Sequence, residues 1–466
     1  MTRLAIYSLL VIGLISVTFT SKLPAVPPPS DTFIQQIIKL LGGNDREFRA
    51  AGLEQIRKSA KGEAATKLFA AELSKLDANG QVALLHALAD RGDAAARPSV
   101  LQLASSSPDE NVRAATIASL GKLGSAADVP VLIKSLSAKS TVEQAAARRS
   151  LVEISGKTIS KTIAAEMKSA PAAVKVQLID ILATRRASSE LPAFVAASVD
   201  NHPSVRMAAM NALGQLGRSE QIPSMLVGVR MAQPGGERDN AEKNVALVCA
   251  RIGNEEARAD TLINALKSVA ADDRDRDQFL SLVGRVGGKK LIDYVRDVAT
   301  GPDAARRRLG IDALSKWPEA SVADVLLEIA TKANNPAEQK QAFQGFVKIG
   351  ATRDNRNDKQ RLERMKQAMK YAHTPEEKNL VINRTRSAYD VESLRFVLPY
   401  VDQPKYGQIA CETIVEIAHH REVRDPHKAE FDKALDKVIR TSKDPIVVER
   451  AQRYKRGETW DRSKKR

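Results

Sequence analysis

Two segments of the chain closely repeat each other. Residues 111–124 read NVRAATIASLGKLG, and residues 204–217 read SVRMAAMNALGQLG. Val112 and Val205 lie 93 residues apart, which corresponds to three periods of 31. A period between about 20 and 50 residues is typical of solenoids, in which each unit buries its apolar face only against its neighbours. The repeat therefore predicts one stack of similar units rather than several globular domains.

The repeating unit has the pattern of a helical hairpin. Val112, Ala115, Leu120 and Leu123 recur near the 3.6-residue period of an α-helix. Residues 105–110, just before them, contain serines, a proline and acids that favour a turn and a helix start. Glycines that each close an apolar stretch, most of them 32 to 36 residues apart, are Gly92, Gly124, Gly156, Gly217, Gly253, Gly287 and Gly350. We expect these glycines to end helices in the left-handed conformation.

Residues 112–124 and 205–217 resemble HEAT repeats, especially the bacterial HEAT-like class, which has the pattern V-R-x-x-A-x-x-A-L-G-x-L-G. The resemblance covers roughly residues 33–350, with helical continuation to about residue 455. It implies an all-α solenoid of helical hairpins wound into a right-handed superhelix, whose second helices line a concave surface. It also implies that Arg113 and Arg206 are structural ladder residues, each bonded to an acidic turn residue of a neighbouring unit.

On this resemblance, the exposed side chains of the second helices would contact an extended protein partner. The candidate partner-binding residues are Thr116, Ser119, Asn211, Lys359, Arg361 and Arg364. The last three belong to a charged segment, residues 353–370, whose net charge is +4. A second basic cluster, residues 450–466, has a net charge of +6, so the two contribute more than half of the total of +16. These clusters allow an acidic glycan as a partner.

The N-terminus has the character of an export signal. Arg3 precedes an uncharged, mostly apolar run, residues 4–19. As a helix this run would span about 24 Å, less than the roughly 30 Å hydrocarbon core of a membrane. We therefore expect residues 1–21 to be a cleaved signal peptide or an uncleaved N-terminal anchor, the one part of the chain in contact with a membrane. The expected location is the periplasm or cell envelope.

The remaining organisation follows from composition and repeat spacing. Residues 22–30 form a proline-rich linker, which favours a semi-rigid polyproline II spacer. We expect the regular solenoid over residues 31–350, irregular helical repeats over 351–455 and a basic tail over 456–466. Tyr454 and Trp460 are candidates for capping the last apolar stack.

Catalytic and metal-binding motifs are missing from the sequence, which has neither His-Glu-x-x-His nor Cys-x-x-Cys. Residues 284–290 have the composition of a phosphate loop but fit a turn between repeats. The histidines of residues 418–427 fit a polar loop, and Cys249 and Cys411 fit buried thiols. The sequence thus predicts a non-catalytic, exported protein-interaction scaffold without a cofactor. Two alternatives stay open: an accessory module for polysaccharide handling, and a nucleic-acid-binding or DNA glycosylase-like protein, with nucleic acid disfavoured by the export signal.

Overall fold

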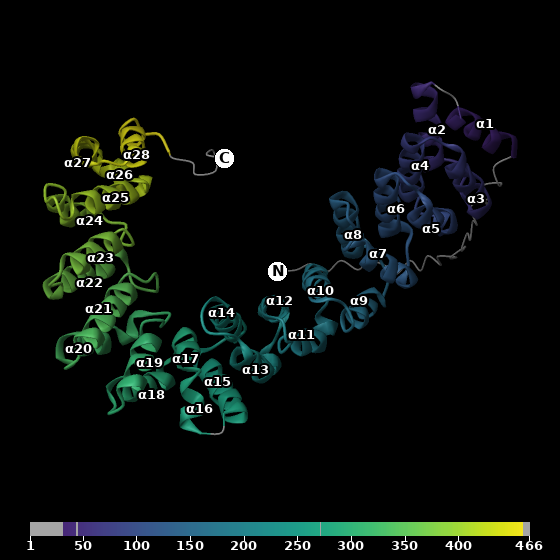
Figure 1. Ribbon diagram of the computed structural model, residues 1–466. Helices are drawn as coiled ribbons and strands as arrows, with labels where there is room; N and C mark the ends of the chain where they lie inside the picture. Colours follow the sequence, from purple (N-terminus) through teal and green to yellow (C-terminus); the bar gives the residue numbers. More distant parts are fainter. Residues whose placement is uncertain (1–30, 43–44, 271, 460–466) are drawn as a thin grey trace, which may run out of the picture. The chain divides into compact units, whose positions relative to one another are not determined.

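The computed structural model describes residues 31–42, 45–270 and 272–459. All regular structure in these ranges is helical (Figure 1). No helix in the described ranges is both long and apolar enough to cross a membrane. The predicted signal segment 1–21, the linker 22–30 and most of the predicted tail 456–466, including Trp460, lie outside the described residues.

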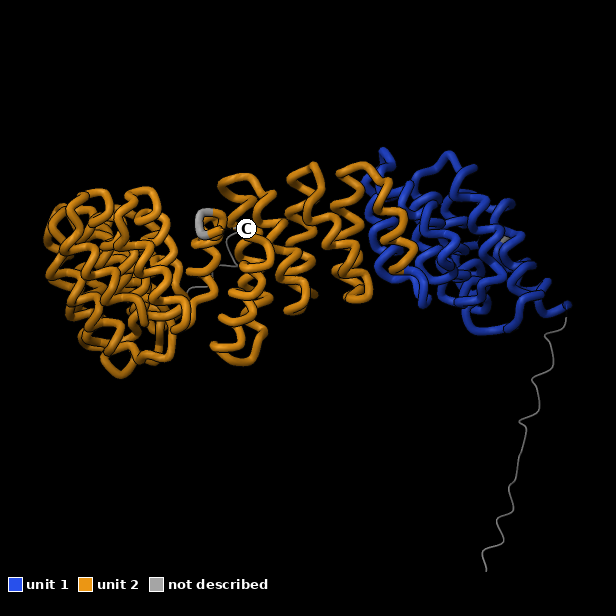
Figure 2. The backbone as a smooth tube through the Cα atoms, turned by 90° about the horizontal axis from the view of Figure 1, so that it is seen from below, with its two compact units in different colours: residues 1–159 blue, residues 160–466 orange. Residues whose placement is uncertain are grey.

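The chain forms two compact units, residues 1–159 and 160–466 (Figure 2). Both consist of successive helical hairpins, as the repeat predicts. The boundary expected at residue 350, between regular and irregular repeats, stays a prediction. Hairpins continue through the segment expected to be irregular, because helices α22 to α28 pair in the same manner as those before them.

The described part of unit 1 contains four hairpins, with short 3₁₀ turns between some helices. Its first helices are α1 (Asp31–Gly42), α3 (Glu63–Ala71), α5 (Arg97–Ser106) and α7 (Val129–Ser135). Its second helices are α2 (Arg46–Lys58), α4 (Ala78–Arg91), α6 (Glu110–Leu123) and α8 (Thr141–Glu153). Its 3₁₀ turns are η1 (Glu72–Lys75), η2 (Ala94–Ala96) and η3 (Ala126–Asp128).

Unit 2 continues the alternation. Its first helices are α9 (Ile159–Met167), α11 (Leu191–Ala197), α13 (Ile222–Met231), α15 (Glu255–Val269) with the short α16 (Asp273–Asp277), α18 (Lys289–Thr300), α20 (Ala323–Lys332), α22 (Asp358–Tyr371), α24 (Val391–Val397) and α26 (Arg421–Arg424) with α27 (Lys428–Thr441). Its second helices are α10 (Ala172–Thr184), α12 (Pro203–Leu216), α14 (Gly236–Ala250), α17 (Leu280–Val286), α19 (Ala304–Leu314), α21 (Pro336–Gly350), α23 (Pro375–Thr385), α25 (Gly407–Ala418) and α28 (Pro445–Lys455). Its 3₁₀ turns are η4 (Ser188–Glu190), η5 (Ser219–Gln221), η6 (Ala320–Val322), η7 (Leu398–Tyr400) and η8 (Asp425–His427).

Second helices begin at repeated capping residues in unit 1. The carboxylates of Asp45, Asp77 and Asp109 each accept a hydrogen bond from a backbone N–H of the first turn of the helix that follows. These aspartates are spaced by 32 residues. An N-cap of this kind stabilises a helix by about 1 kcal/mol. The repeat period therefore appears in the helix N-caps as well as in the apolar positions.

Each second helix packs against the second helix of the next hairpin within its unit. In α4 and α6 the side chains of Leu84, Leu88, Val112 and Leu120 are fully buried. Because the same helix also packs against its own first helix, its apolar stripe is wide. The exposed part of each second helix is correspondingly a narrow stripe of side chains.

The glycines end helices for more than one reason. Gly92 follows α4 in the left-handed conformation, with φ of 72°, as predicted. The same prediction is wrong for Gly124 and Gly217, whose φ angles are −75° and −65°. At both positions a Cβ atom would collide with the carbonyl oxygen four residues earlier, that of Leu120 or Leu213. A steric limit, rather than a left-handed turn, therefore accounts for glycine there.

The last hairpins of unit 2 close over a shared apolar core. Tyr454 of α28 is buried against this core, and its hydroxyl lies 3.0 Å from Nδ1 of His419. The guanidinium groups of Arg424 and Arg450 lie over its ring, 5.5 and 5.8 Å from the centroid. Tyr454 therefore covers the apolar stack at this end of the described chain, as the sequence predicts.

Candidate functional site

Arg113 clamps two consecutive hairpins of unit 1 together. Its Nε and Nη2 donate to Oε1 of Glu143 in α8, at 3.0 and 2.7 Å. Its Nη1 donates to the carbonyl oxygens of Ser107 and Pro108, in the turn before α6. This is the neighbour-to-neighbour arrangement that the HEAT resemblance implies for a ladder arginine.

Arg206 makes the same set of bonds in unit 2. Its guanidinium donates to both carboxylate oxygens of Glu237, at 2.8 and 3.1 Å, and to the carbonyls of Asp200 and Asn201. Arg307 repeats the pattern with Glu338 and the carbonyls of Gly301 and Pro302. Sequence reasoning did not single out Arg307. The signal was available, because each clamp arginine has a glutamate 30 or 31 residues later.

Two of the predicted partner-binding residues are buried. The prediction that Thr116 and Ser119 are exposed is wrong, because both side chains are almost completely inaccessible. The Thr116 hydroxyl donates to the carbonyl of Val112, and the Ser119 hydroxyl donates to those of Ala115 and Leu85. With their hydroxyls bonded to helix carbonyls, these residues pack as small core side chains between α4 and α6.

Asn211 lies where the sequence predicts, on the exposed stripe of α12. Its Oδ1 accepts a hydrogen bond from Nδ2 of the buried Asn244, at 2.9 Å. The neighbouring exposed positions on α12 are Met207, one turn before, and Gln215, one turn after. We name the exposed stripe of successive second helices the second-helix face of each unit.

The other three predicted residues lie on a first helix, α22, and so do not share a face with Asn211. Lys359 is exposed there. Arg361 is buried and bonded to the carbonyl of Arg356 and to Asp358, so its predicted exposure is wrong. Arg364 is paired with Asp324, with Nη1 and Oδ1 2.6 Å apart. Two of the cations of residues 353–370 are therefore paired with acids within the fold.

On the second-helix face of unit 1, the residues near the C-terminal ends of successive second helices carry charges of alternating sign; we call this position the C-terminal register. Lys58, Asp90, Lys122 and Glu153 succeed one another on α2, α4, α6 and α8 at spacings of 32, 32 and 31 residues. Asp90 accepts from Lys122 at 2.7 Å, and Arg149 and Glu153 pair at 2.8 Å. A hollow of about 230 Å³ lies among these side chains. The charges in this hollow largely satisfy one another.

Near the C-terminal ends of four successive second helices of unit 2, the charges have one sign. Arg285, Lys316, Lys348 and Arg384 lie at or just beyond the C-terminal ends of α17, α19, α21 and α23. Their spacings of 31, 32 and 36 residues match the repeat period. We name these four residues the cationic ladder; the helices that carry them succeed one another in unit 2 (Figure 1). Sequence reasoning missed the ladder, although its period is visible in the sequence.

The ladder is only half neutralised by the protein itself. Arg285 pairs with Asp239 and Glu242, and Lys316 bonds to Asp312 and to the hydroxyl of Ser281, both at 2.6 Å. Lys348 and Arg384 are exposed, and neither has a carboxylate within ion-pair distance among the described residues. Desolvation by neighbouring groups and the positive charges of Lys316, Arg285 and Arg384 lower the pKa of Lys348. The positive charges of Lys348 and Arg384 are thus unpaired within the described residues.

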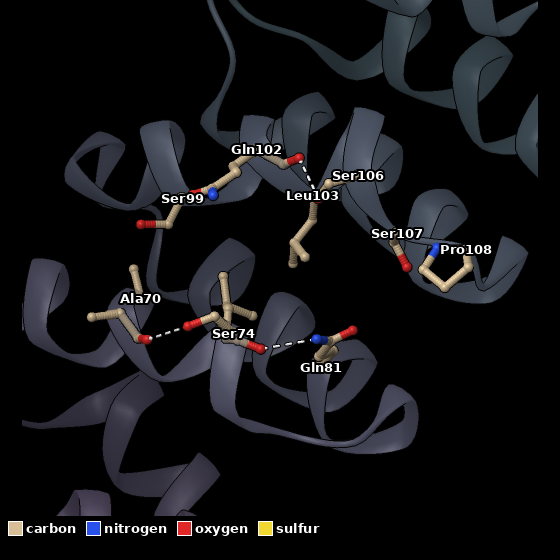
Figure 3. A pocket seen from close by; sticks show the side chains of 11 residues that line it. Ala70, Ser74, Gln81, Ser99, Gln102, Leu103, Ser106, Ser107 and Pro108 are labelled. Carbon is tan, nitrogen blue, oxygen red and sulfur yellow. Dashed lines mark hydrogen bonds between the residues drawn. The ribbon is translucent and has the colours of Figure 1, made fainter.

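Hollows at the turns between hairpins have a different character. Figure 3 shows one of about 300 Å³ between α3–α4 and α5–α6, bordered by Ser74, Gln81, Gln102 and Ser106. Gln81 donates to the carbonyl of Leu73, and the hydroxyls of Ser74 and Ser106 donate to those of Ala71 and Gln102. These polar side chains already form hydrogen bonds to backbone carbonyls. The hollow is therefore a packing gap between repeats.

The residues considered for chemistry have ordinary structural surroundings. Cys249 and Cys411 are buried, and desolvation raises the pKa of their thiols to about 12 and about 11. Gly284 lies inside α17, and the turn predicted for residues 284–290 is confined to Gly287 and Gly288 before α18. His420 stacks on Tyr389, with ring centroids 3.5 Å apart. Within the described ranges, no three His, Cys, Asp or Glu side chains converge as a metal site would require.

Clamped helical hairpins with an exposed second-helix face define an α-solenoid. Residues 65–152 match the family model of HEAT repeats. No curated protein matches the sequence. Solved structures similar to the chain include Kap121p (12% identity, TM-score 0.48, 92% of this chain and 57% of that one) and the karyopherin Kap121p bound to the extreme C-terminus of the protein phosphatase Cdc14p (10% identity, TM-score 0.48, 88% and 54%). The chain spans a little over half the length of these karyopherin chains.

Proposed function

We propose that this protein is a non-catalytic interaction scaffold that works outside the cytoplasm, with the second-helix face of unit 2 as its binding surface. One observation carries the proposal. Large apolar side chains are exposed on this face beside polar ones: Met207 is 37% exposed, Leu247 55% and Leu309 45%. Exposed apolar side chains set among polar residues are characteristic of protein interaction sites.

The clamp arginines explain how such a face can bind. Each clamp fixes one hairpin to the next, so the exposed side chains are presented on a framework that needs little ordering when a partner arrives. Preorganisation of this kind lowers the entropic cost of association. A partner that crosses several hairpins gains many small contacts, which suits an extended protein segment.

A cross-linking experiment tests the binding surface. A photo-reactive amino acid is placed at Leu247 on the second-helix face and, as a matched control, at Val227 on the first helix α13, which is also an exposed apolar side chain. We expect illumination of intact cells to give discrete protein adducts from position 247 and few from 227. Equal adducts from both positions would contradict the assignment of the face.

The location is supported by Arg3 and the apolar run of residues 4–19. A reporter enzyme that matures only outside the cytoplasm, fused after residue 466, tests it. We expect activity from the full chain and none when residues 4–19 are deleted. Reporter activity that survives the deletion, or that is missing from both fusions, would count against export.

A further inference from the structure

We propose that the cationic ladder is a docking site for an extended, acidic segment of a partner protein, which crosses α19, α21 and α23 with carboxylates next to Lys348 and Arg384. The inference rests on the scaffold function proposed above and specifies the chemistry of the partner. It starts from the contrast between the two units. In unit 1 the C-terminal register carries alternating charges, each paired with a neighbouring opposite charge, whereas α17, α19, α21 and α23 of unit 2 carry four cations in succession.

Further unpaired positive charges lie along the exposed faces of α19 and α21. Arg308 on α19 and Lys340 on α21 lie two helical turns before Lys316 and Lys348, and therefore on the same stripes. Both are exposed, and neither has a carboxylate within ion-pair distance in the described part of the chain. Asp312 is the acid that α19 contributes between its two cations. An anionic ligand would therefore meet four cations that the fold leaves unpaired.

Electrostatic repulsion within the ladder supports an anionic occupant. Lys316, Arg285 and Arg384 all act on the Lys348 ammonium, and Asp312 offsets them only in part. A carboxylate bound beside Lys348 would relieve this repulsion, and it would do so in a site already partly shielded from water. Interactions between charges strengthen as water is excluded.

Geometry gives the spacing of the acids. Packed helices lie about 9 Å apart, and a polyproline II segment rises about 3.1 Å per residue with three residues per turn, so that every third side chain points the same way. An extended segment of this kind that crosses the second helices therefore advances about three residues from one rung to the next. The matching sequence has an acidic side chain at every third position.

The chemistry of the face favours a peptide over nucleic acid. Leu309 is exposed next to Arg308, and Leu380 is half-buried one turn before Arg384, so apolar contacts lie beside the charges. Arg285 and Lys316 are already paired with carboxylates, which weakens the attraction for a uniformly charged polyanion. No aromatic side chain lies on α19, α21 or α23 at an exposed position, where bases could stack.

The test measures peptide binding by fluorescence anisotropy with the full chain. The probe is a labelled peptide with glutamate at every third position and glycine and serine between. A second peptide has the same composition with its glutamates consecutive. We expect the spaced peptide to bind at least about tenfold more tightly than the clustered one, and its affinity to fall as salt is added.

Two double variants change the charge by the same amount, one on the cationic ladder and one on the first helix α22. Lys348→Glu with Arg384→Glu should weaken binding of the spaced peptide at least about tenfold. The control pair is Lys359→Glu with Lys370→Glu, two exposed lysines on α22, and it should change the affinity by less than about twofold. Circular dichroism verifies that both variants keep their helical content.

Three results would overturn the inference: equal weakening by both variant pairs, equal affinity for both peptides, or tighter binding of a single-stranded oligonucleotide than of the spaced peptide. The last result would point to nucleic acid. If any of these results is found while position 247 still gives photo-adducts, the scaffold function is retained and only the acidic segment is rejected.

Discussion

Arg206 and Glu237 form a bidentate ion pair between α12 and α14, with both side chains more than nine-tenths buried. The same guanidinium also holds the turn before α12 through two carbonyls. One side chain thus joins a turn, its own helix and the next hairpin. The stack of hairpins depends on such polar joints as well as on apolar burial.

Replacing Arg206 by alanine should loosen this joint strongly. The change leaves the Glu237 carboxylate buried without its partner, which costs about 3 to 5 kcal/mol in comparable pairs. We expect faster hydrogen exchange in α12 and α14, with the last hairpins of unit 2 unaffected. Arg251→Ala serves as a comparison, because it removes only bonds to the carbonyls of Gly214 and Gly217. Unchanged exchange in Arg206→Ala would contradict the clamp.

Acid should weaken unit 2 at the pair formed by Lys175 and Asp200. The hydrogen bond from Lys175, at 2.8 Å, lowers the pKa of Asp200 to about 2. Because the folded pKa lies below the ordinary value near 4, this pair stabilises the fold above about pH 4 and its contribution is lost as the pH falls towards 2. In Lys175→Met the denaturation midpoint should therefore depend less on pH between 4 and 2. A slope identical to that of the unaltered protein would refute this.

Substituting two helix-ending glycines should separate conformational from steric effects. Gly92→Ala places a side chain at φ of 72° with no atom nearby, so the cost should be about 1 to 2 kcal/mol. Gly92→Asn should recover part of this loss, because asparagine tolerates the left-handed conformation. Gly124→Ala has a favourable φ yet collides with the Leu120 carbonyl. We expect it to be at least as destabilising, and Gly124→Asn should bring no rescue in thermal denaturation.

Ser119 should matter for stability and not for partner binding. Its hydroxyl bridges α6 to α4 through the carbonyl of Leu85, at 3.1 Å. Loss of that bond in Ser119→Ala should cost about 1 kcal/mol, measured by urea denaturation. Cross-linking from position 247 should be unchanged. A loss of adducts without a loss of stability would restore Ser119 as a contact residue.

The fold could be predicted because its signals are local and repeated. The spacing of Val112, Leu120 and their counterparts fixes helices, and the glycines mark their ends. Whether a polar side chain points to solvent or into the core could not be predicted in the same way. Thr116 and Ser119 satisfy their hydroxyls on helix carbonyls, so in the folded state they behave as small apolar residues although their side chains are polar.

The cationic ladder was missed for a related reason. No single rung is unusual, since Lys348 and Arg384 each stand among many basic residues in a chain of net charge +16. The ladder exists only when four hairpins are aligned in register. Conversely, the basic segment 353–370 is conspicuous in the sequence, yet Arg361 and Arg364 find acids or carbonyls within the fold. Local charge density is thus a poor guide to the charge that remains free.

The clamp has a consequence for how a chain of this kind can change its length. Each clamp arginine bonds to a carboxylate that stands 30 or 31 residues later, and Arg113, Arg206 and Arg307 use equivalent positions in their hairpins. No hairpin carries both members of a clamp, because the arginine lies on one second helix and its glutamate lies on the next. Loss or duplication of one clamped hairpin alone would therefore leave an arginine or a glutamate without its partner, whereas a change of both hairpins together would keep the pair. The polar joints thus restrict viable insertions and deletions at these places to pairs of hairpins, and the binding face can be lengthened or shortened there in steps of two rungs.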